Sequence, residues 1–147
     1  MEIKNVKQTK VFGRVVKTNL KNIYNQVKVV PEQVYFEMNK KGFQSEGPQV
    51  WIYYGADGNP ETEFDLLVGY PVADELMDNS ITALGQFKCV TALHSGDWAR
   101  FKESYDKLID EVMNKGMQMT GECREVYHQV DFENVENNLT EIQVGIK

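Results

Sequence analysis

The spacing of apolar positions predicts a long helix in the second half of the chain. Within residues 95–116, one helix face is marked by side chains that recur at steps of three and four: Trp98, Phe101, Tyr105, Leu108 and Val112. Asp97 precedes this run as a plausible N-cap, and Gly116 is placed to end it in a left-handed conformation. The spacing makes Trp98, Phe101 and Tyr105 expected core residues.

The segments around this helix are rich in strand-forming residues. Residues 86–94 precede it, and residues 122–130 and 139–146 follow it, which predicts the order strand, helix, strand, strand. The first half has the same order. A strand over 10–18 comes first, then a helical pattern over 19–30 that restarts at Pro31 and runs to 42, then strands over 48–55 and 64–72.

The two halves also match in sequence. Residues 38–54, "MNKKGFQSEGPQVWIYY", align without gaps with residues 112–128, "VMNKGMQMTGECREVYH". Gly42 falls on Gly116, and Trp51 falls on Glu125. We therefore expect one domain, residues 1–147, built from a duplicated unit. Repeat 1 covers about 8–72, a link covers about 73–85, and repeat 2 covers about 86–147.

A duplicated β-α-β-β unit predicts an α+β fold, an antiparallel sheet with helices on one face and a ligand cleft between the halves. On each strand the more apolar side is expected to meet the helices, which assigns Val50, Ile52 and Tyr54 to that face. The opposite face then collects aromatic residues and carboxylates: Trp51, Tyr53, Asp65, Cys123, Glu125, Tyr127 and Glu141.

These aromatic and acidic residues either face solvent, where exposed aromatic rings are unfavourable, or line a pocket. Aromatic rings attract cations through their quadrupoles, and a carboxylate in an apolar cleft supplies an opposing charge. The predicted ligand-binding residues are therefore Glu125, Trp51, Tyr53, Tyr127, Asp65 and Glu141. Cys123 shares this face and is read either as a reactive thiol or as a small buried one.

Composition and charge narrow the classes of function. The net charge is −6, which argues against direct nucleic-acid binding. The sequence shows no apolar run typical of a signal peptide or a membrane span, so we expect a cytoplasmic protein without a membrane partner. The sequence has two cysteines far apart and two histidines, and none of them falls in a recognised metal-ligand spacing. We therefore expect no metal site and no cofactor. Reduced thiols are favoured over a disulfide.

The ordered set of segments resembles the GyrI-like domain, the effector-binding domain of AraC/XylS-type and MerR-type multidrug regulators. The second half, "ALHSGDWARFKESYDKLIDEVMNKG…GECREVYHQV…LTEIQVGI", carries most of the likeness, and the first half is a weaker copy. The resemblance covers residues from about 8 to 147. It implies two pseudo-symmetric halves that bind lipophilic, often cationic, aromatic compounds in a cleft.

The resemblance also implies roles for individual residues. "REVY" matches the central strand whose glutamate meets the ligand, so Glu125 takes that role, with Trp51, Tyr53 and Tyr127 as aromatic walls. Glu141, in "TEI", matches a second acidic position.

No helix-turn-helix pattern precedes residue 8, which predicts a stand-alone ligand-binding domain. A DNA-binding regulator or gyrase is then an expected type of protein partner. Two alternatives stay open beside ligand binding: a gyrase-interacting or toxin-protection protein, and a hydrolase of strained electrophilic genotoxins that uses Glu125.

Overall fold

The computed structural model describes residues 1–147, apart from the side chain of Val27. Within that part, eight strands form one antiparallel sheet in the order β1-β6-β8-β7-β3-β4-β2-β5. The strands are β1 (Glu2–Val6), β2 (Thr9–Thr18), β3 (Val50–Tyr54), β4 (Phe64–Val72), β5 (Ile81–Leu84), β6 (Phe87–Ser95), β7 (Met119–Gln129) and β8 (Leu139–Ile146).

The helices are α1 (Ile23–Val27), α2 (Val30–Lys40) and α3 (Phe101–Asn114), with short 3-10 turns η1 (Trp98–Arg100) and η2 (Val135–Asn137). Asp97 caps η1, because its carboxylate accepts a hydrogen bond from the backbone N–H of Ala99 at 3.0 Å. Gly116 ends the last helix with φ +70°, a left-handed conformation that favours glycine. Both predictions for the ends of this helical region are confirmed.

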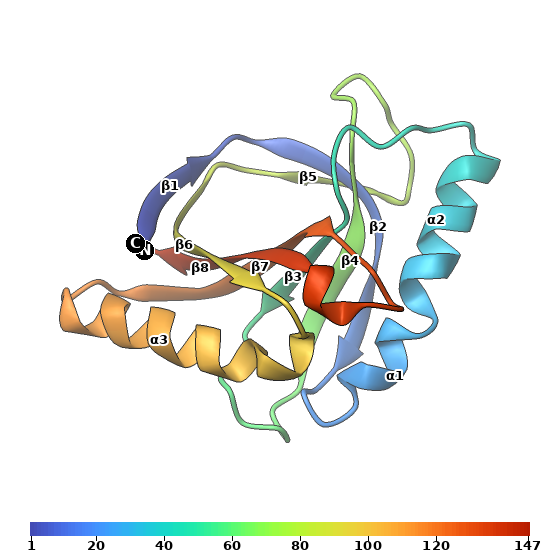
Figure 1. The fold of residues 1–147 in the computed structure, drawn as a ribbon. Coiled ribbons are helices and arrows are strands. Elements are labelled where there is room, and N and C mark those ends of the chain that lie inside the picture. Colours follow the sequence, from blue (N-terminus) through green and yellow to red (C-terminus); the bar gives the residue numbers. More distant parts are fainter.

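The two halves of the chain meet at the centre of the sheet, where β3 pairs with β7. The first half contributes β3, β4 and β2 in that order outward, and the second contributes β7, β8 and β6. α2 packs over β2 and β4, and α3 packs over β6 and β8, so β3 and β7 lie between the helices (Figure 1). The predicted α+β fold is confirmed, and the duplication of the sequence stays a prediction.

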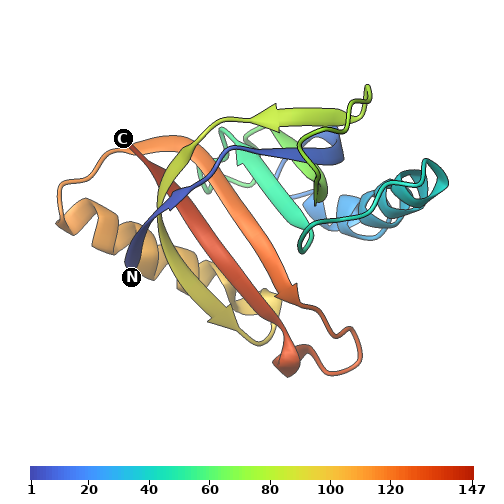
Figure 2. The same ribbon diagram turned by 90° about the horizontal axis from the view of Figure 1, so that it is seen from above.

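Two strands, β1 and β5, were not predicted from the sequence. They are the edge strands of the sheet, and most of their residues are exposed. An edge strand with little burial has no need of alternating apolar residues, so the pattern carries no strand signal there. Figure 2 shows both strands running along the same side of the molecule.

The predicted faces of β3 and β7 were wrong. Trp51 pairs with Val68 of β4, and Glu125 pairs with Trp51 and with Ile142 of β8, so these side chains share one face. That face is the one the helices cover, because Val68 packs in a core with α2 and Ile142 in a core with α3. On β4 and β8 the more apolar side does meet the helices, as predicted for each strand: the helix-side cores contain Phe64, Leu66 and Val68 of β4, and Ile142, Val144 and Ile146 of β8.

The reason lies in a second core on the other face of the sheet. There Val50 and Ile52 pack with Val11, Leu67 and Leu84. β3 is therefore buried on both faces, and alternation within "VWIYY" does not distinguish one from the other. Among the described residues, no helix is long and apolar enough to cross a membrane.

Candidate functional site

Glu125 lies on β7 at the centre of the sheet, on the face that the helices cover. Its side chain is only 2% exposed, and its neighbours across the strands are Trp51 and Ile142. A carboxylate in such a place is costly unless hydrogen bonds or an opposite charge compensate it. Glu125 is therefore a candidate functional residue.

Three tyrosine hydroxyls compensate the Glu125 carboxylate. Tyr53 from β3 donates to Oε1 at 2.8 Å, and Tyr127 from β7 donates to the same oxygen at 2.5 Å. Tyr105 from α3 donates to Oε2 at 2.5 Å. The cluster joins strands of both halves to a helix, so its geometry depends on the complete fold.

The environment shifts the acidity of all four groups. Burial raises the pKa of Glu125 above its usual value, and the hydrogen bonds from Tyr105, Tyr127 and Tyr53 offset part of that rise. Burial, and then the charge of Glu125, hold the pKa values of the three tyrosines well above their usual range. The tyrosines thus act as neutral donors at physiological pH, and the carboxyl is the group that titrates.

A row of aromatic rings connects the carboxylate to the molecular surface. Trp51 packs edge-on against Tyr127 at 5.9 Å between ring centroids, and Tyr127 packs against Trp98 at 5.5 Å. Trp98 in turn contacts Phe132 at 5.9 Å, and Phe132 is 78% exposed. The row of ring contacts thus runs from the exposed Phe132 to Tyr127, whose hydroxyl donates to the buried Glu125 carboxyl.

The structure brings together four of the six predicted site residues. Trp51, Tyr53, Glu125 and Tyr127 form one cluster. Asp65 and Glu141 lie on the opposite face of the sheet, since Asp65 pairs with Tyr54 and Glu141 pairs with Val126. The predicted common face for all six was wrong, because it followed from the incorrect assignments of β3 and β7.

Asp65 is a surface residue. Its carboxylate lies 3.3 Å from Lys17 Nζ, and both side chains are about half exposed or more. An ion pair of this kind contributes little to stability.

Glu141 is instead the centre of a second polar network. Its Oε2 accepts hydrogen bonds from Lys4 and Thr91 at 3.0 Å and from Gln143 at 2.7 Å, and its Oε1 lies 3.0 Å from His128 Nε2. Burial alone would raise the pKa of this carboxyl, but these hydrogen bonds outweigh it and lower the pKa to about 2. Glu141 is therefore a permanent negative charge that is already satisfied by protein groups.

Sequence reasoning placed Tyr105 and Trp98 in the core and missed their contacts with the site. Their helical spacing correctly indicates that they face the sheet, but it does not show which strand residue each one meets. Had Glu125 been assigned to the helix-covered face, the same spacing would have placed Tyr105 above it. Tyr105 lies three residues before Leu108, which packs on that face.

The remaining reactive groups have structural partners. Both cysteines are free, and burial, followed by the charge of Glu125, raises the pKa of Cys123 to about 11. His94 Nδ1 lies 2.7 Å from Ser104 Oγ, and Nε2 lies 2.8 Å from the carbonyl oxygen of Asp97. In the part of the chain that the structure describes, no three His, Cys, Asp or Glu residues are grouped to hold a metal.

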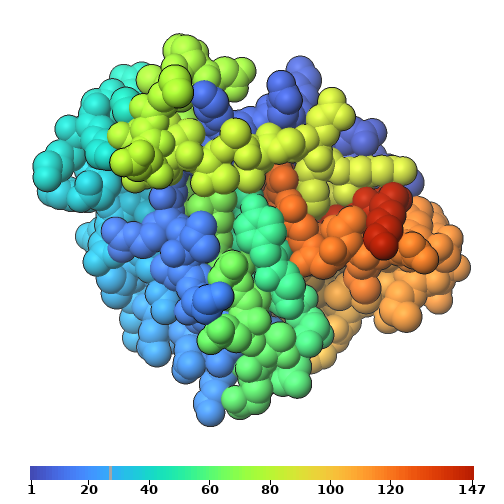
Figure 3. Space-filling view, turned by 180° about the vertical axis from the view of Figure 1, so that it is seen from behind, coloured from blue at the N-terminus to red at the C-terminus, as the bar shows by residue number. Residues whose placement is uncertain are grey.

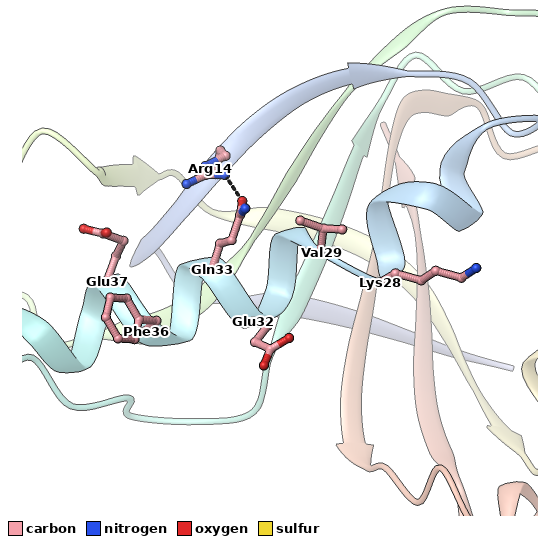
Figure 4. Close-up of a pocket in the computed structure, with 7 residues that line it drawn as sticks. All are labelled: Arg14, Lys28, Val29, Glu32, Gln33, Phe36 and Glu37. Carbon is pink, nitrogen blue, oxygen red and sulfur yellow. Dashed lines mark hydrogen bonds between the residues drawn. The ribbon is translucent and has the colours of Figure 1, made fainter.

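Two cavities lie away from Glu125. One, of about 540 Å³, is a hollow beside α2 that is lined mainly by charged and polar side chains, among which Arg14 donates to Gln33 (Figure 4). The other, of about 630 Å³, lies on the sheet face opposite the helices. Figure 3 shows the molecule from behind, where the segments near residues 50 and 125 lie side by side.

Comparison with known proteins shows the fold. No protein-family profile matches the sequence, and no curated protein sequence matches it. Among solved structures, the EcmrR C-terminal domain is similar with a TM-score of 0.82 and 16% identity, over 99% of this chain and 96% of that one. EcmrR in its complex with DNA is similar with a TM-score of 0.83 and 15% identity over 99% of this chain. The present chain spans 56% of the length of EcmrR in that complex.

Two further structures share the fold at greater distance. SAV2435 bound to tetraphenylphosphonium has a TM-score of 0.69 and 10% identity, over 99% of this chain and 93% of that one. A hydrolase from Listeria innocua has a TM-score of 0.61 and 11% identity, over 99% of this chain and 92% of the hydrolase. The chain has the fold of these proteins, as the resemblance to GyrI-like domains predicts.

Proposed function

We propose that this protein binds lipophilic, cationic, aromatic small molecules beside Glu125. One observation carries the proposal: a buried carboxylate, held by three tyrosine hydroxyls, lies at the inner end of an aromatic row that reaches the surface. Binding would combine burial of apolar surface, ring contacts and neutralisation of the Glu125 charge. The structure of SAV2435 with tetraphenylphosphonium supports this ligand class, because a protein of the same fold binds such a cation.

The physical basis of selectivity is the difference between a tyrosine donor and a cation as partner for Glu125. In the free protein the hydroxyls satisfy the carboxylate, but they leave its negative charge in place. A lipophilic cation brings an opposite charge without a hydration shell that is costly to remove, so it gains more at this position than a neutral ring. A hydrophilic cation would lose its hydration without equal compensation.

The test compares two ligands of similar shape. Methyltriphenylphosphonium carries a positive charge, and triphenylphosphine oxide is neutral. In a fluorescence titration, Glu125→Gln should weaken the phosphonium by about tenfold or more and change the oxide by less than about twofold. Equal losses for both ligands, or no loss for the cation, would contradict the role of Glu125.

Asp65→Asn provides the matched control for this titration. It also removes one carboxylate from a strand next to β3, but on the opposite face and beside Lys17. It should leave the affinity of both ligands unchanged, because an exposed charge on the far side of the sheet is screened by water.

A hydrolase is the second candidate function. It is favoured by the raised pKa of Glu125, which suits a general acid or base, and by the shared fold with a hydrolase from Listeria innocua. In this function Glu125 would accept a proton from a water molecule that attacks a strained or activated ligand. Turnover detected by mass spectrometry and abolished in Glu125→Gln would favour the hydrolase, and intact ligand after prolonged incubation would favour binding alone.

A protein partner is a separate proposal. EcmrR, which has this fold in its C-terminal domain, has been seen in a complex with DNA. For the present chain we propose that any effect on DNA passes through a partner, such as a DNA-binding regulator or gyrase, because its net charge of −6 opposes direct contact. Purification of the tagged protein from cytoplasmic extract, with and without methyltriphenylphosphonium, tests for such a partner.

A further inference from the structure

We propose a second small-molecule site on the sheet face opposite Glu125, which takes a small aromatic monoanion with an N–H or O–H donor beside its carboxylate. The site is the cavity of about 630 Å³ on that face, here called the second-face cavity. Its lining combines the apolar side chains of Val11, Val50 and Val126 with the polar groups of Arg124 and Gln143. A volume of this size is typical of sites for drug-sized ligands.

Gln143, which lines the cavity, carries an unused acceptor. Its side chain is only 3% exposed, and its Nε2 donates to Glu141 Oε2 at 2.7 Å. Because Glu141 is ionised and can only accept, this bond fixes which end of the amide points toward it. The other end, Oε1, is buried and has no hydrogen-bond partner among the residues that the structure describes.

An unpartnered buried carbonyl oxygen is uncommon in folded proteins and calls for a donor. Gln143 is one of the residues that line the cavity, so on this proposal a ligand N–H or O–H bound there supplies the donor that the buried oxygen lacks. The first requirement on the ligand is therefore a hydrogen-bond donor.

Arg124 supplies the second requirement. It is 5% exposed, and it is the register partner of Gln143 on the neighbouring strand, so the two side chains lie side by side on this face. Its Nε donates to Glu122 at 2.7 Å, and its guanidinium lies 4.0 Å from the centroid of the Phe87 ring. These contacts hold the guanidinium plane, and a guanidinium is a group suited to a carboxylate.

The surroundings limit the charge and shape of the ligand. Glu46, Asp74 and Glu75 also line the second-face cavity, and their charges oppose a multiply charged anion. The valine side chains favour a flat apolar body. A planar ring system with one carboxylate next to one N–H meets all of these conditions.

This site is distinct from the one at Glu125. Val126 follows Glu125 on β7, and successive side chains of a strand point to opposite faces of the sheet. Ligands at the two sites would be separated by the sheet itself and should not compete by contact.

Indole-2-carboxylate is the probe for the test, since its N–H and carboxylate are adjacent. Isothermal titration calorimetry compares it with 1-methylindole-2-carboxylate, which lacks the donor, and with indole-2-carboxamide, which lacks the charge. The wild-type protein should bind each analogue about tenfold more weakly than the parent. Equal affinity for all three compounds, or no binding of the parent, would overturn the proposal.

Two variants locate the binding. Gln143→Met has a similar shape but no acceptor amide, so it should lose the preference for the N–H compound over its N-methyl analogue. Glu125→Gln, and saturation with methyltriphenylphosphonium, should leave the affinity for indole-2-carboxylate unchanged. If the Glu125→Gln substitution or the competing phosphonium abolishes the binding of indole-2-carboxylate, the anion occupies the Glu125 site and the second site is refuted. Should Gln143→Met fail to fold, Val126→Phe, which fills the cavity from β7, should reduce the affinity in its place.

Discussion

Tyr105 and Glu125 connect α3 to the centre of the sheet through a hydrogen bond of 2.5 Å between the tyrosine hydroxyl and Oε2. The other carboxylate oxygen accepts from strand residues, Tyr53 and Tyr127. The helix therefore supplies the sole donor to Oε2 among the described residues. Any movement of α3 relative to β7 would change the hydrogen bonding, and hence the pKa, of Glu125.

Tyr105→Phe should destabilise the folded protein by about 1–2 kcal/mol, because it leaves a buried carboxylate oxygen without its donor. The pKa of Glu125 should rise further for the same reason. Urea unfolding followed by circular dichroism measures the first effect. Tyr24→Phe is the control, since Tyr24 is 66% exposed and should tolerate the loss of its hydroxyl. Equal stability of Tyr105→Phe and wild type would show that the bond contributes little.

Binding of a lipophilic cation should strengthen as the pH rises through the raised pKa of Glu125. The ionised carboxylate attracts the cation and the protonated form does not, so the bound cation lowers this pKa and binding releases a proton. Titration of methyltriphenylphosphonium from about pH 5 to about pH 8, in buffers of different ionisation enthalpy, measures both affinity and proton release. The profile should be flat in Glu125→Gln. A flat wild-type profile would mean that Glu125 does not sense the ligand.

Much of the architecture could be predicted because most elements have a clear period. Alternation in β4 and β8 identified their helix-covered sides, and the three- and four-residue spacing identified α3. The pattern failed where burial is two-sided or absent. β3 is apolar throughout because both of its faces are packed, and β1 and β5 carry little pattern because they are exposed edges.

The candidate site shows the same division. Glu125, Trp51, Tyr53 and Tyr127 could be grouped from alternation within their strands and from the alignment of the two halves, and the structure pairs Trp51 with Glu125. Tyr105 could not be joined to them without knowing which face α3 covers. Asp65 and Glu141 do lie on the predicted face, away from the helices, but their predicted neighbours do not, because one wrong strand face carries an entire alternating set of residues with it.

The two tryptophans should report differently on a ligand at Glu125. Trp51 is 3% exposed and its Nε1 donates to Gln49 at 2.7 Å, whereas Trp98 is partly exposed and lies nearer the surface in the aromatic row. Trp51→Phe and Trp98→Phe each leave one emitting residue. Acrylamide should quench Trp98 more strongly than Trp51 in the free protein.

Methyltriphenylphosphonium should then protect Trp98 from acrylamide, because a ligand on the aromatic row covers that ring. Trp51 should show little change in accessibility, since it is already buried. If the cation protects neither tryptophan while still binding, its site lies away from the aromatic row.

Glu141 should control stability in acid. The pKa of Glu141 is about 2 in the folded protein and 4.5 as its usual value, so the folded state binds fewer protons than the unfolded state between these pH values. The stability that Glu141 contributes is therefore complete above about pH 4.5 and is lost as the pH falls toward 2. The lowering of this pKa from 4.5 to about 2 corresponds to roughly 3 kcal/mol.

Urea unfolding at a series of pH values tests this difference with two matched variants. Glu141→Gln should lower the free energy of unfolding by roughly 2–3 kcal/mol near neutral pH, and its loss of stability between about pH 4.5 and 2 should be shallower than that of wild type. Asp65→Asn should stay within about 0.5 kcal/mol of wild type, because its partner Lys17 is exposed. Parallel pH profiles for wild type and Glu141→Gln would show that the network around Glu141 does not hold its charge in the way the geometry indicates.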